Sequence, residues 1–295
     1  SLIWDETLSF SQMPQVTNPQ SGFVLSANQT PFNVTAESEN PQQSAYAPEH
    51  GFQMDMTNRA HRGLELFAQF GPTISADEFS AIKHDKFYSP ATHYVGYLEK
   101  IKAQQFSDSV LQRAQRVIEQ WDLGTDVDNT SAALGTCVLL AAERDDERES
   151  HDAAAVAALL GDCAQGLLDA KGQLDPPWGE VNRHVRGEVN VPVGGGPDIL
   201  RAIYGQGLQA DGFLTNVAGD GLYYLVAWDA EGELNVEGVH QFGSATLDEA
   251  SPHYSDQALD YANEVLHAPL FDEASLQQNL LRAYRPGAEI IGAAP

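Results

Sequence analysis

The sequence predicts an α+β fold in which a helical middle segment separates strands near the two ends of the chain. Near the start, residues 22–27 form a short and mostly apolar run, as expected for a strand buried on both faces. In the middle, between residues 57 and 170, apolar residues recur at helical spacing. Beyond them, two strand candidates at 222–228 and 234–242 flank an acidic turn. We expect strands from both ends to meet in one sheet.

The composition describes an acidic globular protein. Its 295 residues are 42% hydrophobic and 9% aromatic, which is typical of a chain with a packed core. The 42 acidic residues outnumber the 16 lysines and arginines, and the formal net charge is −26 at pH 7. Such a surface repels nucleic acid and anionic lipid, so we expect neither as a partner. No run of residues is long and apolar enough to predict a membrane span.

Residues 1–35 contain a loop followed by the first predicted strand. Pro19 and Gly22 indicate a turn before the strand. Asn28 lies where the strand leaves its sheet, so its side-chain amide could point into a cleft and donate to a developing oxyanion. The pattern alone favours a simpler interpretation, in which Asn28 is a turn residue. The polar stretch 35–51 is expected to be a surface loop.

Residues 57–170 carry helix-start signals followed by apolar periodicity. Ser75 and Glu78 form a capping-box pattern, in which each side chain satisfies a backbone N–H at the helix start. The charged run 143–149 is expected to be a solvated connection between two helices. The helices are predicted to begin near Thr57, Ser75, Ser107 or Asp108, Ser131 and Asp152, and the first to end at Gly71 and Pro72.

Residues 172–295 are rich in loop signals before they return to strand patterns. The run from Gly194 to Asp198 lacks the Gly-Lys-Ser/Thr that a phosphate-binding loop requires, so we interpret it as loop geometry. Residues 229–233 are expected to connect the two strand candidates as a hairpin. Asp272 and Glu273 predict the start of a last helix, and the C-terminus is expected to be a frayed tail.

The only two cysteines are Cys137 and Cys163, and each lies within an Ala/Leu-rich helical pattern. Small buried thiols are common in such cores. An exported protein could join the two, but a single pair does not define a disulfide framework, and we expect free thiols.

His240 and His253 are the histidines that most suggest a metal or general-base role. A histidine at a strand end or in a proline-containing loop is more often a hydrogen-bonded structural group, so we expect no catalytic role for either. No Gly-x-Ser-x-Gly sequence is present to support a Ser-His-Asp triad.

Six short segments carry further information about the class of protein. They are WDETLSFSQMP at 4–14, NPQSGF at 18–23, NQTP at 28–31, TNRAHR at 57–62, PWGEV at 177–181 and SPHYSDQ at 251–257. In this order they resemble segments of the penicillin acylase family, over essentially all 295 residues and in the C-terminal part of that family's β chain. The resemblance implies part of the αββα fold of N-terminal-nucleophile hydrolases, in which a processed serine cleaves amides.

In terms of this resemblance, the whole of 1–295 is one part of an acylase β chain. Residues 1–35 carry a core strand with the oxyanion asparagine. Residues 57–170 form the helical segment, and 172–295 form a loop-rich region that returns to the sheet.

The resemblance assigns roles to two residues. Asn28 corresponds to the asparagine whose side-chain N–H stabilises the tetrahedral oxyanion, with a second donation from an upstream backbone N–H. Arg59 corresponds to the arginine that supports both the nucleophile's free amine and the oxyanion asparagine, although its placement requires an insertion in the loop 35–51. Ser1 aligns well inside the β chain, so we expect the nucleophile to lie outside this sequence. A chain that begins at Ser1 without Met or signal peptide is expected to be a processed product or a piece.

The resemblance also implies an activity and its setting. We expect the complete enzyme to release an acyl group from a small amine such as an acyl-homoserine lactone or a β-lactam, which would give it a role in quorum quenching or antibiotic turnover. Residues 239–245 and 251–254 favour the acyl-homoserine-lactone or aculeacin type. The expected location is periplasmic or secreted. This part alone is expected to be inactive.

The expected partners are the N-terminal part of the β chain and the α chain of the same precursor. No cofactor is expected for the chemistry. The family implies a structural calcium near the junction of its two chains, but its ligands cannot be assigned here, and Asp55 is only a weak candidate.

A different class of function stays open from the sequence alone, namely a non-catalytic, acidic helical module that binds a partner. The two hypotheses differ in the surface that they require. A large uncovered apolar face would favour a part of a larger enzyme, whereas a closed polar surface would favour the binding module.

Overall fold

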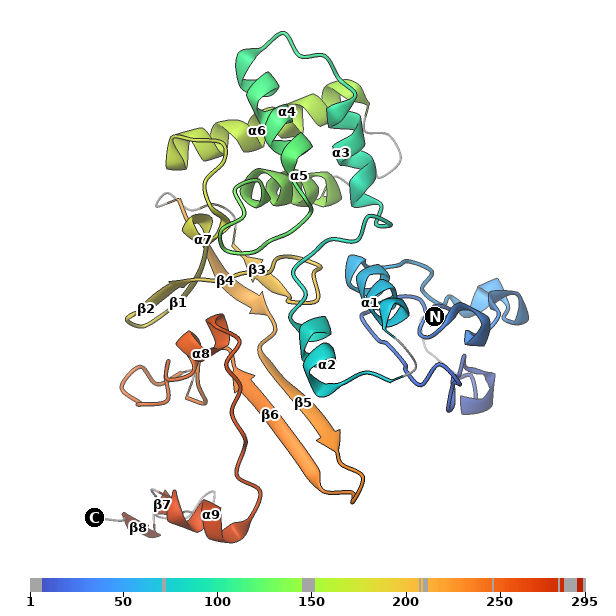
Figure 1. The fold of residues 1–295 in the computed structure, drawn as a ribbon, viewed down its shortest axis with the longest axis vertical. Coiled ribbons are helices and arrows are strands. Elements are labelled where there is room, and N and C mark those ends of the chain that lie inside the picture. Colours follow the sequence, from blue (N-terminus) through green and yellow to red (C-terminus); the bar gives the residue numbers. More distant parts are fainter. Residues whose placement is uncertain are drawn as a thin grey trace, which may run out of the picture.

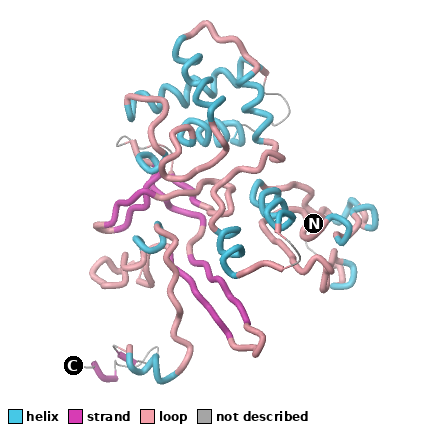
Figure 2. Tube along the Cα trace, in the orientation of Figure 1, coloured by secondary structure: helices cyan, strands magenta, loops and turns pink. Residues whose placement is uncertain are grey.

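The protein has an α+β architecture with four visible parts (Figure 1). The computed structural model describes residues 7–70, 73–144, 152–206, 208, 212–245, 247–280, 282–283 and 291–293. A helical unit lies above a four-stranded sheet, an N-terminal arm lies beside them, and a long hairpin extends below (Figures 1 and 2). The mixed fold class predicted from the sequence is therefore confirmed. The αββα arrangement implied by the resemblance stays a prediction.

The N-terminal arm, residues 7–57, is irregular apart from single 3-10 turns. The predicted strand at 22–27 is wrong, because Leu25 makes one backbone bond to Val34 O (2.7 Å) and no ladder follows. Val24 is 58% exposed, so the segment buries one face only. An apolar run needs neighbouring strands to become a buried strand, and the described residues supply none. The 3-10 turns are η1 Phe10–Gln12, η2 Glu37–Glu39, η3 Gln43–Ala45 and η4 Pro48–His50.

Two capped helices follow the arm, α1 Asn58–Gln69 and α2 Ala76–Lys83. Thr57 Oγ1 accepts the N–H of Ala60 at the start of α1, and Ser75 forms the predicted capping box at the start of α2. The arm packs on α1, since Phe23 stacks on Phe67 with ring centroids 4.5 Å apart. The predicted end of α1 at 71–72 lies outside the described residues.

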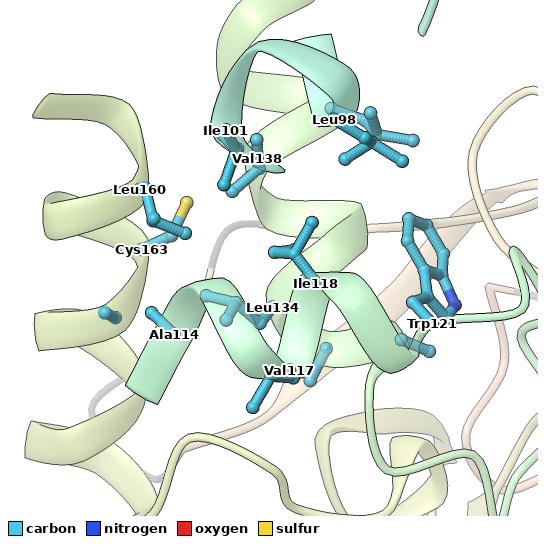
Figure 3. Packing of buried hydrophobic residues seen from close by; sticks show 14 of the residues in the cluster. Leu98, Ile101, Ala114, Val117, Ile118, Trp121, Leu134, Val138, Leu160 and Cys163 are labelled. Atoms are coloured by element: carbon cyan, nitrogen blue, oxygen red, sulfur yellow. The ribbon is translucent and has the colours of Figure 1, made fainter. Parts of the chain in front are cut away.

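The helical unit encloses its own core. Apolar side chains from four different helices meet in this core, and many of them are at most 1% exposed (Figure 3). Helix α3 was not predicted, because His93 at its N-cap makes no side-chain capping bond and Gly96 interrupts the apolar pattern. The other three helices begin where the sequence predicts. The helices are α3 Tyr94–Lys102, α4 Ser109–Gln120, α5 Ala132–Arg144 and α6 Ala153–Lys171, and the core side chains include Leu98, Ile101, Ile118, Leu134 and Leu160.

Cys137 and Cys163 form a disulfide between α5 and α6, so the prediction of free thiols is wrong. Their Cα atoms lie 5.9 Å apart, within the range that a disulfide spans. Helix periodicity shows that both residues face a core, but it does not show that the two helices are neighbours. Of the charged run 143–149, predicted to connect these helices, Glu143 and Arg144 belong to the end of α5, and 145–149 lie outside the described residues.

A four-stranded sheet underlies the helical unit, where the sequence predicted mainly loops. Its strand order is β2-β1-β4-β3, with β1 and β4 parallel and the outer pairs antiparallel. The strands are short and carry Asn, Arg, Pro and Gly, so alternation does not reveal them. The elements are α7 Trp178–Val181, β1 Asn182–Arg186, β2 Val189–Pro192, β3 Ile203–Gly205 and β4 Leu214–Gly219.

The predicted hairpin is confirmed as β5 Leu222–Trp228 and β6 Leu234–His240. It forms a two-stranded sheet of its own, so the expected single sheet from both chain ends is not found in the described ranges. The predicted last helix begins after Asp272 as expected. A short strand pair replaces the predicted frayed tail. The remaining elements are α8 Ala258–Ala262, α9 Glu273–Gln278, β7 Arg282–Ala283 and β8 Ile291–Ala293.

His184 on β1 connects the sheet to the end of the hairpin. Its side chain is fully buried, Nε2 donates to the carbonyl of Gln241 (2.7 Å), and Nδ1 accepts from Asn216 Nδ2 (3.2 Å). Burial, the main cause, lowers the pKa of His184 to about 4. The ring is therefore neutral and holds one tautomer at neutral pH.

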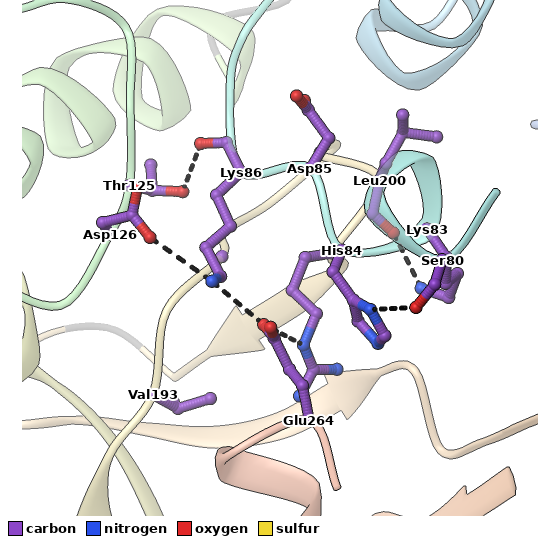
Figure 4. Close-up of polar contacts among 12 residues, drawn as sticks. Ser80, Lys83, His84, Asp85, Lys86, Thr125, Asp126, Val193, Leu200 and Glu264 are labelled. Carbon is purple, nitrogen blue, oxygen red and sulfur yellow. Dashed lines mark hydrogen bonds and ion pairs between the residues drawn. The ribbon is translucent and has the colours of Figure 1, made fainter. Parts of the chain in front are cut away.

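A network of charged side chains, most of them partly buried, joins the segment after α2, the residues beside the sheet and the segment after α8. Lys86 Nζ lies 3.3 Å from Asp126 and 3.1 Å from Glu264 (Figure 4). Glu264 lies 3.5 Å from the guanidinium of Arg201, which is fully buried and also pairs with Asp220 (3.2 Å). Each charge has at least one opposite partner, which offsets the desolvation cost of burying it.

Within the described ranges, no helix combines the length and the apolarity that crossing a bilayer takes.

Candidate functional site

Asn28 lies on the surface of the arm, at a position fixed by its neighbours in sequence. Its backbone is in the left-handed region, with φ of +63°, which asparagine tolerates better than most residues. Thr57 Oγ1 donates to the carbonyl of Ala27 (2.8 Å), and the N–H of Thr30 donates to the carbonyl of Asp55 (2.9 Å). These bonds tie both sides of Asn28 to the segment that leads into α1.

Arg59, in the first turn of α1, bonds directly to Asn28. Its Nη2 donates to Asn28 Oδ1 (3.0 Å), and its Nε donates to Asp198 Oδ1 (3.0 Å). The structure thus brings together the two residues singled out from the sequence. Because Arg59 occupies the carbonyl side of the Asn28 amide, Nδ2 with its two N–H donors is directed away from the guanidinium.

Asp198 is the third member of the site, and no sequence pattern identifies it as one. Its second oxygen accepts the backbone N–H of Asn58 (2.6 Å), an unpaired donor in the first turn of α1. Its own carbonyl accepts from Asn58 Nδ2 (2.7 Å), and its N–H donates to the Tyr204 hydroxyl (3.0 Å). Asp198 is therefore held on four sides, with its backbone in the left-handed region (φ +52°).

The loop Gly194–Pro197 carries Asp198 to α1. Gly195 has a φ of +92°, and a Cβ there would fall 2.3 Å from the carbonyl of Arg201. Only glycine fits that position. The Trp178 indole N–H donates to the Gly195 carbonyl (2.9 Å), which holds the loop to α7. The signal in the sequence was an acid directly after a glycine-rich turn, but nothing local indicates that it reaches Arg59.

Asn58 anchors the same corner from inside. It is fully buried, and its Oδ1 accepts the backbone N–H of Ser89 (2.7 Å) while its Nδ2 holds Asp198. One side chain thus joins α1, the segment before α3 and the glycine-rich loop. The site is a rigid corner at the start of α1, with Asn28 as its exposed tip.

The charge of Arg59 is balanced where it lies. Asp198 is mostly buried beside it, so the pair presents little net charge to its surroundings. The structure therefore favours orientation of the Asn28 amide as the main effect of Arg59. Arg62, one turn further on, makes a two-point contact with Asp85 (2.9 and 2.8 Å), and that carboxylate raises the pKa of Arg62.

The other candidates from the sequence do not join this corner. Ser1 lies outside the described residues. Asp55 is exposed and offers its backbone carbonyl to Thr30, and the described ranges contain no group of three His, Cys, Asp or Glu side chains placed to hold a metal. These residues do not fit a calcium site by themselves, and no step of chemistry is assigned to calcium.

His240 and His253 both bond within the C-terminal segment. The backbone N–H of His240 donates to Gln257 Oε1 (2.8 Å), and His253 Nδ1 pairs with Asp256 (2.8 Å) in an exposed position. The Arg186 guanidinium lies 3.7 Å above the Tyr254 ring. The segment 251–257 thus packs on the β1–β2 tip.

A fixed amide donor with its carbonyl occupied is suited to stabilise a negative oxygen, the requirement of hydrolases that act through a tetrahedral intermediate. The chain belongs to the penicillin amidase family, whose model matches residues 2–278. Among solved structures it is similar to the thermostable penicillin G acylase from Alcaligenes faecalis in its orthorhombic form, with 15% identity and a TM-score of 0.47. That match covers 99% of this chain and 61% of the acylase chain. No curated protein sequence matches the chain.

Proposed function

We propose that this chain supplies the oxyanion-binding part of an amide hydrolase. The observation that carries the proposal is the bond from Arg59 Nη2 to Asn28 Oδ1 (3.0 Å). A cationic donor on the amide oxygen orients the amide and leaves Nδ2 to donate to the substrate. It also withdraws electron density from the amide, which strengthens the N–H as a donor.

In the proposed reaction, the serine hydroxyl attacks the substrate amide carbonyl and its own α-amino group takes the proton. The carbonyl oxygen becomes negative, and Asn28 Nδ2 donates to it. Collapse of the intermediate expels the amine, which takes up the proton, and leaves an acyl-enzyme. Water then attacks the ester in the same way and releases the acid and the serine.

We place this serine on the N-terminal part of the β chain, and we take that part and the α chain as the partners. The apolar outer face of the β5–β6 hairpin supports this placement. Leu222, Tyr224, Val226 and Trp228 alternate along β5 on that face, and each is 45–67% exposed. An isolated hairpin with one bare apolar face is marginal in water, so a larger assembly that covers it is favoured over a self-contained polar binding module.

The substrate we propose is an acyl group joined to a small amine, such as an acyl-homoserine lactone or a β-lactam. The leaning towards acyl-homoserine-lactone or aculeacin acylases rests on the sequence of residues 239–245 and 251–254. A periplasmic or secreted location is supported by the disulfide Cys137–Cys163, because such bonds persist in oxidising compartments.

The test is to purify the native protein from its source, measure the intact mass of every chain, and assay hydrolysis. We expect a longer β-type chain that contains this sequence, a smaller partner chain, and release of acid and amine in equal amounts. An active chain that begins at Ser1 and stands alone would overturn the placement of the nucleophile. A lone chain without hydrolysis would support the non-catalytic binding module.

A further inference from the structure

A cavity of about 310 Å³ lies between the helical unit and the four-stranded sheet. Helices α5 and α6 form one side, and α7, β1, β3 and β4 form the other, with the helices above the sheet in Figure 1. Asn28, Arg59 and Asp198 do not line it. Most of its wall is apolar, including Leu140, Leu167, Trp178, Val181, Ile203 and Leu214.

We propose that this cavity is a second binding site, for a small apolar molecule that carries no negative charge. Protein interiors rarely leave voids larger than a water molecule, whereas ligand sites are apolar hollows of this size with few polar groups. The proposal goes beyond the amide hydrolysis proposed above.

The volume sets the size of the ligand. An engineered apolar cavity of about 150 Å³ binds benzene, so about twice that volume accepts a fused two-ring aromatic or a chain of roughly eight carbons. On the side of the sheet the cavity is closed by Trp178 and Ile203, which are fully buried.

One polar group in the wall lacks a partner. Thr136 on α5 is 1% exposed, and its hydroxyl makes no hydrogen bond with any described group. A buried hydroxyl without a partner is costly. Its oxygen is closed off from the cavity, so a ligand does not bond to it, and the wall that the ligand meets is mostly apolar.

The rim determines the charge of the ligand. Asp162 on α6 is exposed at the rim, and the chain as a whole carries a net charge of −26. A carboxylate there repels an anionic head group and attracts an ammonium group. Alcohols and amines are therefore accepted, and carboxylates are excluded.

Gly166 on α6 provides a way to close the cavity. It lines the wall, and a Cβ added there would have no atom within 4 Å. Gly166→Phe places a ring into this open space. Gln165, the next residue on the same helix, is exposed and does not line the cavity, so Gln165→Phe adds the same ring outside.

Isothermal titration calorimetry of the purified protein with 1-octanol, octylamine and octanoate tests the proposal. We expect octanol and octylamine to bind at one site and octanoate to bind at least about tenfold more weakly. Gly166→Phe should abolish octanol binding, and Gln165→Phe should preserve it. Octanol binding that survives in Gly166→Phe would place the ligand elsewhere, for example on the β5–β6 face, and would overturn the proposal.

A second variant keeps the test decisive if Gly166→Phe fails to fold, as judged by circular dichroism. Asp162→Asn removes an exposed charge and leaves the wall intact. We expect octanoate to bind this variant about as tightly as octanol, and octylamine to lose several-fold in affinity. Octanoate that binds the unmodified protein as tightly as octanol, or no binding of octanol at all, would contradict the proposal.

Discussion

The helical unit and the β5–β6 hairpin differ in what covers their apolar faces. Both are visible in the sequence as clear patterns. In the helical unit the apolar faces of α3 to α6 meet one another, so side chains such as Leu134 are fully buried. In the hairpin, Tyr223 and Val239 pack inward on Tyr261, while Trp228 on the outer face is 67% exposed. Within the described residues, the helical unit buries its apolar faces against one another, whereas the outer face of the hairpin stays largely exposed.

This difference separates stability from function. The helical unit contains most of the buried apolar core, and a disulfide joins two of its helices. We therefore expect it to determine whether the chain folds. The arm and the hairpin lie at its margins, where the Asn28 corner and the bare apolar face are found.

Truncating the core should cost far more than truncating the hairpin. We expect Leu134→Ala to lower the free energy of unfolding by about 3–5 kcal/mol, because it leaves a cavity among fully buried neighbours. Trp228→Ala should change it by less than about 1 kcal/mol in this chain alone, since the ring is mostly exposed. Urea unfolding followed by circular dichroism measures both changes. Equal losses would contradict the view that the helical core contributes more to stability than the outer face of the hairpin.

Removing the disulfide should loosen the helical unit. The bond closes a loop with a sequence separation of 26, so Cys137→Ala with Cys163→Ala should lower the free energy of unfolding by about 3 kcal/mol. Dithiothreitol should lower the stability of the unmodified protein and leave the double variant unchanged. A reductant effect on the double variant would point to another cause.

Acid should weaken the junction between the sheet and the hairpin. The pKa of His184 is about 4 in the folded protein, below its ordinary value of about 6.5. The unfolded chain thus binds the extra proton first as pH falls, and the stability that is complete above pH 6.5 is lost towards pH 4. The loss is at most about 3 kcal/mol. Urea titrations at pH 7 and pH 4 should show a smaller difference for His184→Gln, and an identical difference would exclude His184 as the cause.

The smallest predicted effect concerns the residue that holds Arg59. Asp198→Asn removes a charged acceptor from Arg59 but retains most of the loop's contacts, so we expect kcat of the assembled enzyme to fall about tenfold with KM little changed. Asp198→Glu should recover part of the loss. A change in KM alone would mean that Asp198 acts on substrate binding and not on the orientation of Asn28.

The sequence predicts the elements that depend on local signals and misses those that depend on distant partners. Helices α1, α2 and α4 to α6 were predicted because caps such as Thr57 and Asp108 and the apolar period are local signals. Strands β1 to β4 were missed, and a strand at 22–27 was wrongly predicted, because strand identity depends on distant partners. The disulfide was missed for the same reason.

The residues of the candidate site also differ in whether the sequence alone identifies them. Asn28 and Arg59 lie within segments that resemble a known family, so the sequence identifies them. Asp198 is 139 residues from Arg59 and in no such segment, so only the fold shows that it completes the corner.

The kcat of Asn28→Ala in the assembled enzyme tests whether Asn28 donates to the oxyanion. Asn18→Ala is the matched control, since Asn18 is also exposed in the arm and left-handed (φ +49°) but makes no bond to Arg59. We predict that Asn28→Ala lowers kcat about a hundred- to a thousandfold with little change in KM or in the unfolding midpoint, and that Asn18→Ala does not. Equal kcat values in the two variants would contradict the assignment of Asn28 as the oxyanion donor.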